Sequence, residues 1–437
     1  MSDEDSARSP GAPTPPRPAR PAGSAQPARP APSPHPSRRR LLGAATGVAL
    51  LGVAGSSRAG AATVRDDRAQ APDGAAGRTS PGPAPHASAV EEQPRPLYTG
   101  TYTSSGGPGI AVMTYDPGSG SVSPSGTLPS VADPSFLAAR GDGLLYAVDE
   151  NEDRVTAVAV GGGAPRVLNS SAAGGSGPCH LAVHRAGGHL LTANYGSGSV
   201  AVHRLAADGS LGERTDLVQH TGSGPDPDRQ SGPHTHMVLN DPGGAFVLAV
   251  DLGTDTVYTY RLDTGSGRLT GVSTAKAPAG AGPRHAAFHP SGRFLYVANE
   301  LGDSLTVCGY DPDTGTVTPG DSLPTVPAGS GGAERNYPAE VAVCADGAFV
   351  YVSNRGHDSI ARFRVADGGA RLELLDAVPS GGAYPRHIAL APGDAWLFAA
   401  NQNSGTVAVF ARDGATGALT PAGDPLAVTA PVCVLPQ

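Results

Sequence analysis

The chain has 437 residues and is rich in glycine and proline, with 61 Gly and 43 Pro, whereas only 16% of its residues are charged. So few charged residues argue against a coiled coil or a helical repeat, and the formal net charge of −8 argues against a nucleic-acid-binding protein, which normally presents a basic face. The length allows two or three ordinary domains or one large β architecture.

The first 96 residues precede the part of the chain that can form a core. Residues 1–36 are dominated by Pro, Ala and Ser, so we expect a disordered extension. Within 37–62, paired arginines precede an apolar run of about 15 residues and an Ala-x-Ala-like site, which predicts a signal peptide of the twin-arginine type. An uncleaved signal anchor and a start codon placed too far upstream are the alternatives. Residues 63–96 are low in apolar residues and are predicted to be a linker.

The expected location and partners follow from this signal and from the charge. Removal of residues 1–61 takes away eight Arg and three acidic residues, leaving 23 basic and 36 acidic residues and a net charge of −13. We therefore expect an exported protein, extracellular or in the cell envelope, without nucleic-acid partners and without stable membrane insertion after signal cleavage. We expect a monomer that acts on a small molecule.

An internal repeat of about 50 residues fills the region 97–437. Each copy has a Pro, a variable residue, a short apolar strand, a Gly-containing turn, a second apolar strand and then Asn or Asp. The clearest copy begins at Pro283 and predicts four strands over 285–289, 294–299, 304–310 and 317–323. Four antiparallel strands per repeat are typical of a β-propeller blade.

The number of blades follows from one position of the repeat, the residue two after the proline, which we call the ring position. It is occupied in successive copies by Phe136, His180, His236, His285, Glu340 and His387, where His236 is assigned by alignment. A seventh copy begins at Pro431 and stops after its first strand, and segments 97–102, 109–116 and 121–128 resemble the three strands it lacks. The sequence therefore predicts an all-β, seven-bladed propeller whose two ends share one blade. A long β-sandwich or two barrels would not explain the complementary ends.

One rim of the central channel is predicted to collect ionisable groups. The first strand of a blade lines the channel, and its start meets the end of the antiparallel second strand. The residues that this places at the rim are His180, His236, Arg284, His285, Glu300, Glu340, Arg355, Arg386 and His387. Charged groups are costly to bury together unless they are paired or bind a ligand, so a functional site is indicated, with an ion-pair network as the alternative.

Metal ions and cofactors are not expected at this rim. His234 and His236 could share one face of a strand, but no third ligand lies at close spacing. No nucleotide, haem or flavin motif is present. The four cysteines, at 179, 308, 344 and 433, are widely spaced and are predicted to be mostly small buried residues. The Gly/Pro-rich insertion 222–232 is interpreted as a lid or as a tolerated surface loop.

Several of these segments together resemble the seven-bladed lactonase propellers, which include bacterial 6-phosphogluconolactonases and the fungal enzyme that lactonises 3-carboxy-cis,cis-muconate. The matching segments are 98–103, 230–236, 282–300, 337–360 and 384–402, and the resemblance covers essentially all of 97–437. The muconate-type members have a His, two Arg and a Glu at the channel rim. The resemblance implies that His236, Arg284, Glu300 and Arg355 are the catalytic residues here.

The activity implied by the resemblance is hydrolysis of a sugar-type lactone to the hydroxy acid. His236 or Glu300 would activate water, and Arg284 or Arg355 would hold the oxyanion or an anionic group of the substrate. The residues expected to bind or orient the substrate are His180, His234, His285, Glu340, Arg386 and His387. The sugar-lactone members are cytosolic and act on a phosphorylated metabolite, whereas this chain has a predicted export signal. A non-catalytic binding propeller and a lactonising cycloisomerase are the competing hypotheses.

Overall fold

The computed structural model describes residues 93–330 and 334–437. The predicted extension over 1–36, the signal peptide over 37–62 and nearly all of the linker over 63–96 lie outside the described residues. The first strand, β1, begins at Arg95, two residues before the predicted start of the propeller. Within the described ranges no helix has the length and apolar character needed to cross a bilayer.

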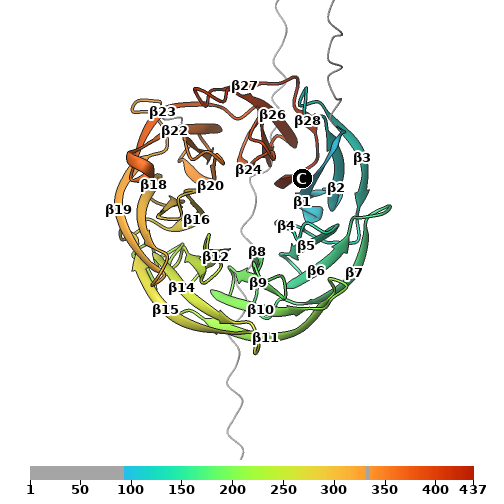
Figure 1. Ribbon diagram of the computed structural model, residues 1–437. Coiled ribbons are helices and arrows are strands. Elements are labelled where there is room, and N and C mark those ends of the chain that lie inside the picture. The colour runs from blue at the N-terminus through green and yellow to red at the C-terminus, as the bar shows by residue number, and fades with distance from the viewer. Residues whose placement is uncertain (1–92, 331–333) are drawn as a thin grey trace, which may run out of the picture. The chain divides into compact units, whose positions relative to one another are not determined.

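The described residues form seven small antiparallel sheets arranged as blades around a central channel (Figure 1). The fold is a seven-bladed β-propeller, as predicted. Figure 1 shows β8, β12, β16 and β20 nearest the channel, and β11, β15, β19 and β23 at the periphery. The first strand of each blade therefore carries the residues that face the channel.

The fourth blade shows why these residues form strands. β17 (Phe294–Asn299) is rich in aromatic and β-branched residues, and it is buried because neighbouring blades cover both of its faces. The turn before it needs a positive φ, which Gly292 supplies at 68°. The strands of this blade are β16 (Pro283–Phe288), β17, β18 (Ser304–Asp311) and β19 (Thr316–Pro324). All four predicted strands are present, with ends that differ by at most two residues.

The other blades repeat this arrangement. The strands of the first blade are β4 (Leu137–Ala139), β5 (Leu144–Asp149), β6 (Arg154–Ala159) and β7 (Arg166–Ala172). Those of the second are β8 (Pro178–Val183), β9 (His189–Asn194), β10 (Ser199–Leu205) and β11 (Leu211–Gln219). Those of the third are β12 (Thr235–Asn240), β13 (Val247–Asp251), β14 (Thr256–Asp263) and β15 (Arg268–Lys276).

The fifth blade has β20 (Tyr337–Val343), β21 (Phe349–Arg355), β22 (Ser359–Ala366) and β23 (Arg371–Pro379). The sixth has β24 (Pro385–Leu390), β25 (Trp396–Asn401), β26 (Thr406–Arg412) and an outer edge split into β27 (Leu419–Pro421) and β28 (Leu426–Ala427). Two short 3₁₀ turns, η1 (Thr103–Ser105) and η2 (Asp367–Gly369), follow β1 and β22.

The two ends of the described chain meet in the seventh blade. Its strands are β29 (Pro431–Pro436), β1 (Arg95–Thr101), β2 (Ile110–Tyr115) and β3 (Val122–Leu128), in that order across the sheet. Leu97 lies opposite Pro436, and Thr99 opposite Val434. The predicted closure of the ring by complementary ends is confirmed, because β29 supplies the inner strand that pairs with β1.

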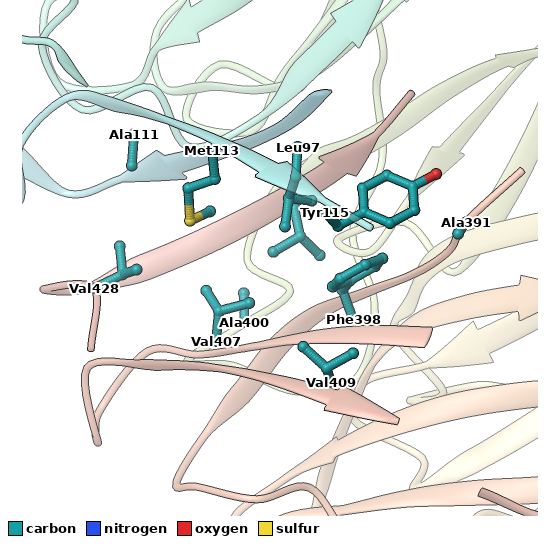
Figure 2. Packing of buried hydrophobic residues seen from close by; sticks show 11 residues of the cluster. Leu97, Ala111, Met113, Tyr115, Ala391, Phe398, Ala400, Val407, Val409 and Val428 are labelled. Atoms are coloured by element: carbon teal, nitrogen blue, oxygen red, sulfur yellow. The ribbon is translucent and has the colours of Figure 1, made fainter. Parts of the chain in front are cut away.

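Apolar contacts between adjacent blades hold the ring together. Figure 2 shows Leu97, Met113 and Tyr115 of the seventh blade packed against Phe398 and Val407 of the sixth. Tyr115 and Phe398 meet edge to face, with ring centroids 5.3 Å apart. Burial of each large side chain contributes about 1.5–3 kcal/mol, so each blade depends on its neighbours for much of its stability.

An extra residue interrupts the strand pairing near the start of six inner strands. In β16, Pro283 lies opposite Asn299 and His285 opposite Ala298, so Arg284 is the extra residue of a β-bulge. The extra residues in β8, β24 and β29 are Cys179, Arg386 and Val432. β20 has a similar shift between Pro338 and Val341. A bulge re-aims the side chain it carries, and all of these lie at the rim where the second strands end.

The pairing of β12 corrects one prediction. Thr235 lies opposite Asp251 and Met237 opposite Val250, so Met237 occupies the ring position and His236 is the bulge residue. The assignment of His236 to the ring position is therefore wrong by one residue. The reason is that this strand begins at Thr235, two residues after Pro233, and the alignment placed Thr235 opposite Arg284 instead of opposite Pro283. His236 is the counterpart of Arg284.

Candidate functional site at the channel rim

A cavity of about 260 Å³ opens at the rim that carries the bulges. Its lining residues are Glu150, Cys179, Tyr195, Arg229, His236, Glu300, Arg355, Tyr384 and Arg386. Most belong to two positions of the repeat. One position is the bulge of an inner strand, and it is occupied by Cys179, His236 and Arg386. The other position is the last residue of the second strand of a blade, or the residue directly after it, and it is occupied by Glu150, Tyr195, Glu300 and Arg355.

Three arginines converge on the carboxylate of Glu300, which is buried. Arg229 Nη2 donates to Oε1 at 2.6 Å, Arg355 Nη2 donates to Oε2 at 2.7 Å, and Arg284 Nε lies 3.2 Å from Oε2. Burial alone would raise the pKa of Glu300, but the charges of Arg355, Arg284 and Arg229 outweigh it and hold this pKa well below its usual range. Glu300 is therefore an ionised anchor and a poor proton acceptor.

Arg284 does not line the cavity. It is 2% exposed, and its Nη1 donates to the Ala339 carbonyl at 2.8 Å. Burial, with repulsion from Arg355 and Arg386, lowers the pKa of Arg284 to about 9. Its guanidinium group still carries a positive charge at neutral pH and faces Glu300.

His236 is a buried neutral imidazole in the cavity wall. Burial, followed by the positive charge of Arg284, lowers the pKa of His236 well below its usual value. Its Nδ1 lies 3.9 Å from Cys179 Sγ, and its ring meets Tyr195 edge to face at 5.5 Å. No described residue makes a hydrogen bond to Nε2, so this nitrogen is available to a ligand in the cavity.

Tyr384 closes another part of the wall in a strained conformation. Its φ is +65°, which is rare for a bulky residue and costs on the order of 1–3 kcal/mol. The backbone N–H of Tyr384 donates to Asp358 Oδ1 at 2.7 Å, which holds this conformation. The Arg355 guanidinium lies over the Tyr384 ring at 5.4 Å. Strain of this kind is commonly retained where it places a functional side chain.

Most of the predicted substrate-binding residues form a layer that does not line this cavity. Glu340 Oε2 lies 2.7 Å from His285 Nδ1 and 3.3 Å from His387 Nε2, and the Phe136 ring packs 3.9 Å from that of His180. Burial raises the pKa of Glu340, and it lowers the pKa of His387 to about 4. Burial also lowers the pKa values of His180 and His285. Of the six predicted substrate-binding residues, only Arg386 lines the cavity.

His234 is separated from this layer. It stacks on Tyr195 at 4.5 Å, and its Nδ1 lies 2.9 Å from the Tyr195 carbonyl oxygen. Because His236 is a bulge residue, the simple two-residue alternation that would place His234 and His236 on one face does not apply. Within 93–330 and 334–437 no group of three or more His, Cys, Asp or Glu side chains is arranged to hold a metal ion.

The insertion 222–232 brings Arg229 to the site. The side chain of Gln230 is buried, and its Nε2 donates to the Leu252 carbonyl at 2.8 Å and to Asp255 Oδ1 at 2.7 Å. This anchor fixes the neighbouring residue, Arg229, so that it reaches Glu300 in the next blade. The loop is thus joined to the site by a specific contact.

Sequence reasoning missed five of the lining residues, which are Glu150, Cys179, Tyr195, Arg229 and Tyr384. The repeat could have indicated three of them. Cys179 has the same place in its copy as Arg284, and Glu150 and Tyr195 have the same place as Glu300. Arg229 has no equivalent in the other copies, so the repeat carried no signal for it.

Comparisons with known proteins agree with this architecture. Residues 96–436 match the family model described as "Lactonase, 7-bladed beta-propeller". A protein of Bacillus subtilis named 6-phosphogluconolactonase is 35% identical over 342 residues, which cover 77% of this chain and 97% of that protein.

Solved structures give the same result. A protein from Lactobacillus plantarum is 34% identical, with a TM-score of 0.75, and the match covers 79% of this chain and 100% of that one. A structure described as a periplasmic gluconolactonase of Pseudomonas aeruginosa is 28% identical, with a TM-score of 0.72, over 79% of this chain and 99% of that one.

Proposed function

Because this chain belongs to the lactonase family of seven-bladed β-propellers, we propose that it hydrolyses a sugar-type lactone to the hydroxy acid in the rim cavity. The observation that carries the proposal is the pairing of a neutral imidazole, His236, with arginine side chains in one small cavity. Ester hydrolysis needs a proton acceptor for water and a positive group for the oxyanion, and both are present.

The proposed reaction begins with a water molecule between His236 and the lactone carbonyl. His236 Nε2 accepts a proton as the water oxygen attacks the carbonyl carbon, and the carbonyl oxygen becomes an oxyanion. When the tetrahedral intermediate collapses, the ring C–O bond breaks, and the proton held by His236 passes to the leaving alkoxide. The product is the open-chain hydroxy acid, and His236 is again neutral.

Arg355 is the arginine best placed to stabilise the oxyanion. Its Nε donates to the Tyr337 carbonyl at 3.1 Å and its Nη2 to Glu300 at 2.7 Å, which fixes the guanidinium plane. No hydrogen bond among the described residues uses Nη1, so this nitrogen is free to donate to a ligand in the cavity that Arg355 lines. Glu300 would act by holding Arg355 and Arg284 in place, because three bound guanidinium groups leave it little basicity.

The setting of the reaction is part of the proposal. The predicted twin-arginine signal over 37–62 and the similarity to a periplasmic gluconolactonase support export of the chain, and we propose that it acts outside the cytoplasm as a monomer on a small molecule. The cavity is smaller than those that hold drug-sized ligands, which suits a lactone of about one sugar unit.

The test is turnover of glucono-δ-lactone by the purified full chain, followed as acid release at constant pH. The variants His236→Gln and Arg355→Gln should each lower kcat/KM by about 10²–10⁴-fold. The thermal unfolding midpoint should stay close to that of the parent protein in His236→Gln and fall in Arg355→Gln, which removes one partner of a buried ion pair. A chain that turns over no lactone in a panel but binds one saturably would contradict the proposal and favour a non-catalytic binding propeller.

A further inference from the structure

Tyr195 lines the cavity and contacts both the proposed base and one of the arginines around Glu300. Its ring meets the His236 ring edge to face, with centroids 5.5 Å apart. Its hydroxyl oxygen accepts a hydrogen bond from Arg229 Nη2 at 3.4 Å. The same nitrogen donates to Glu300 Oε1 at 2.6 Å, and Glu300 Oε2 accepts from Arg355 at 2.7 Å. The hydroxyl is therefore joined, through a continuous series of hydrogen bonds, to the guanidinium group proposed to hold the oxyanion.

The conformation of Tyr195 is fixed by contacts that need no ligand. Its backbone N–H donates to the Gly177 carbonyl at 2.8 Å, and its ring stacks on that of His234 at 4.5 Å. His234 is itself held, because its backbone N–H donates to Oδ1 of the buried Asp251 at 2.9 Å and its Nδ1 lies 2.9 Å from the Tyr195 carbonyl oxygen. A hydroxyl presented at a fixed place is what a catalytic hydrogen-bond donor requires.

The hydroxyl proton of Tyr195 is available to a ligand. A guanidinium group can only donate, so the tyrosine oxygen is the acceptor in its contact with Arg229, and its own O–H is not used there. No other group in 93–330 or 334–437 makes a hydrogen bond to this oxygen. A hydroxyl that accepts from a charged donor is also polarised, and it donates more strongly in turn. Tyr195 can therefore donate to a ligand oxygen in the cavity.

The chemistry of lactone hydrolysis indicates which oxygen this is. In the proposed reaction His236 serves the attacking water and Arg355 serves the carbonyl oxygen. The ring oxygen receives the electron pair of the broken C–O bond, and its only aid so far is the proton returned by His236. Because one imidazole both takes the proton and returns it, the ring oxygen has to lie within reach of His236. Tyr195 is the hydroxyl-bearing neighbour of that imidazole in the cavity wall.

We infer that Tyr195 is a further catalytic residue, which donates a hydrogen bond to the ring oxygen of the lactone as this oxygen becomes the leaving group. The inference rests on the proposed lactone hydrolysis and adds a third function to the site. When the C–O bond breaks, its electron pair passes to the ring oxygen, and the hydrogen bond from Tyr195 strengthens as negative charge develops there. The proton held by His236 then neutralises the alkoxide. Tyr195 keeps its own proton, so no further proton acceptor is needed.

The test compares a lactone with an analogue whose leaving atom is sulfur. Glucono-δ-lactone and 5-thioglucono-δ-lactone carry the same hydroxyl groups, but sulfur is a weak hydrogen-bond acceptor and a thiolate needs little stabilisation. Tyr195→Phe keeps the ring and its stacking. In this variant kcat for the oxygen lactone should fall about 10–100-fold with KM nearly unchanged, whereas kcat for the thiolactone should change by less than about threefold. A merely structural role would lower both rates alike.

The matched control is Tyr258→Phe in β14. It removes a tyrosine hydroxyl that lies 3.3 Å from Thr254 Oγ1, and Tyr258 does not line the cavity. Both rates should be unchanged in this control. If Tyr195→Phe hydrolyses the oxygen lactone as fast as the parent protein, or loses equally on both substrates, the inference is wrong and the proposed activity stands.

Calorimetric binding of 1,5-anhydro-D-glucitol gives a readout without turnover, because this sugar has the ring oxygen but no carbonyl group. Tyr195→Phe should bind it about fivefold more weakly than the parent protein. If the parent hydrolyses neither lactone but binds this sugar more tightly than the variant does, the proposed activity fails and the contact of Tyr195 with the ring oxygen stands. If neither lactone is hydrolysed and the two proteins bind the sugar equally or not at all, both the activity and the inference are wrong.

Discussion

Arg229 and Glu300 are joined by a hydrogen bond of 2.6 Å that links the insertion before the third blade to the end of the second strand of the fourth. The arginine side chain is 36% exposed and the glutamate 6%, so the pair connects the mouth of the cavity to its buried wall. The contact gives the longest interblade insertion a role in the site.

Removal of this contact should reduce activity more than stability. In Arg229→Gln, Glu300 keeps Arg284 and Arg355, but the loop loses its contact with the site. We expect kcat/KM for lactone hydrolysis to fall about tenfold, with little change in the free energy of unfolding, because partly exposed ion pairs contribute little to stability. Steady-state kinetics and urea unfolding of the same preparations check this. Equal kinetics in variant and parent would show that the loop contact is incidental.

Neutralising Glu300 should have a large effect on stability. Glu300→Gln leaves the guanidinium groups of Arg284 and Arg355 buried without their counter-charge, which costs about 3–5 kcal/mol of unfolding free energy. The control is Glu213→Gln, whose side chain is 76% exposed and lies 3.8 Å from Arg204, and which should change stability by less than about 0.5 kcal/mol. Urea unfolding curves that are indistinguishable for the two variants would contradict the role given to Glu300.

Acid should destabilise the fold through the buried imidazoles. The pKa of His387 falls from its ordinary 6.5 to about 4 in the folded protein, and burial lowers the pKa values of His180, His236 and His285 as well. Between pH 6.5 and 4 the unfolded chain then binds more protons, so stability is present above pH 6.5 and is lost as the pH falls toward 4. Glu340 and Asp149, whose pKa values burial raises, act in the opposite sense, but they are two groups against four.

The free energy of unfolding, measured in urea, should therefore drop steadily from pH 7 to pH 4.5. Each histidine contributes a loss of about 1.4 kcal/mol for every pH unit that separates its unfolded and folded pKa values. His387→Asn should show a shallower dependence than the parent. An unfolding free energy that is constant over this range would contradict the neutral state of the buried histidines.

The pH dependence of turnover tests the role of His236. Because burial lowers the pKa of His236 well below 6.5, the proposed base remains unprotonated at mildly acidic pH. We expect kcat/KM to stay level between pH 7.5 and about 6, with its acid limb below the usual range for histidine. An acid limb centred near pH 6.5–7 would indicate a solvent-exposed histidine and would argue against His236.

Ring closure should be essential to the fold. Val434 is fully buried, and a carboxylate in its place could find no partner in the apolar contact between the sixth and seventh blades. Val434→Asp should therefore prevent cooperative folding, or lower the unfolding free energy by several kcal/mol. Val272→Asp, on the exposed outer strand β15, is the matched control because that valine is 40% exposed. Thermal unfolding followed by circular dichroism separates the two outcomes, and similar midpoints would contradict the closure argument.

Much of the architecture could be predicted because each copy of the repeat supports the strand assignments made in the others. The spacing of Pro283, Asn299 and their counterparts predicted the inner hairpins, and the incomplete copy at Pro431 predicted the shared blade. The prediction failed where the repeat itself is altered. Around His236 the proline of the repeat is displaced upstream to Pro233 and Thr235 begins the strand, so the alignment of this copy was shifted by one residue.

The site was predicted in part, for physical reasons that differ from residue to residue. His236, Glu300, Arg355 and Arg386 line the cavity because each stands where a first strand starts or a second strand ends. The depth of a side chain in the channel was not predictable, because a bulge changes where a residue points without changing the sequence period. Hence His285 was expected in the cavity wall, whereas the structure places it next to the wall, 5.0 Å from the His236 ring, in a layer with Glu340 that does not line the cavity.

The bulges have a consequence for how such proteins diverge. In five blades the extra residue of the inner strand is identified, and these five positions carry four different residue types. The residues are Cys179, His236, Arg284, Arg386 and Val432. Because that residue lies outside the regular ladder, its replacement disturbs few backbone hydrogen bonds and little of the apolar packing between blades. At the positions that take no part in the buried ion pairs of Glu300, single mutations can then change substrate preference over evolutionary time while the strand pairing of the ring is kept.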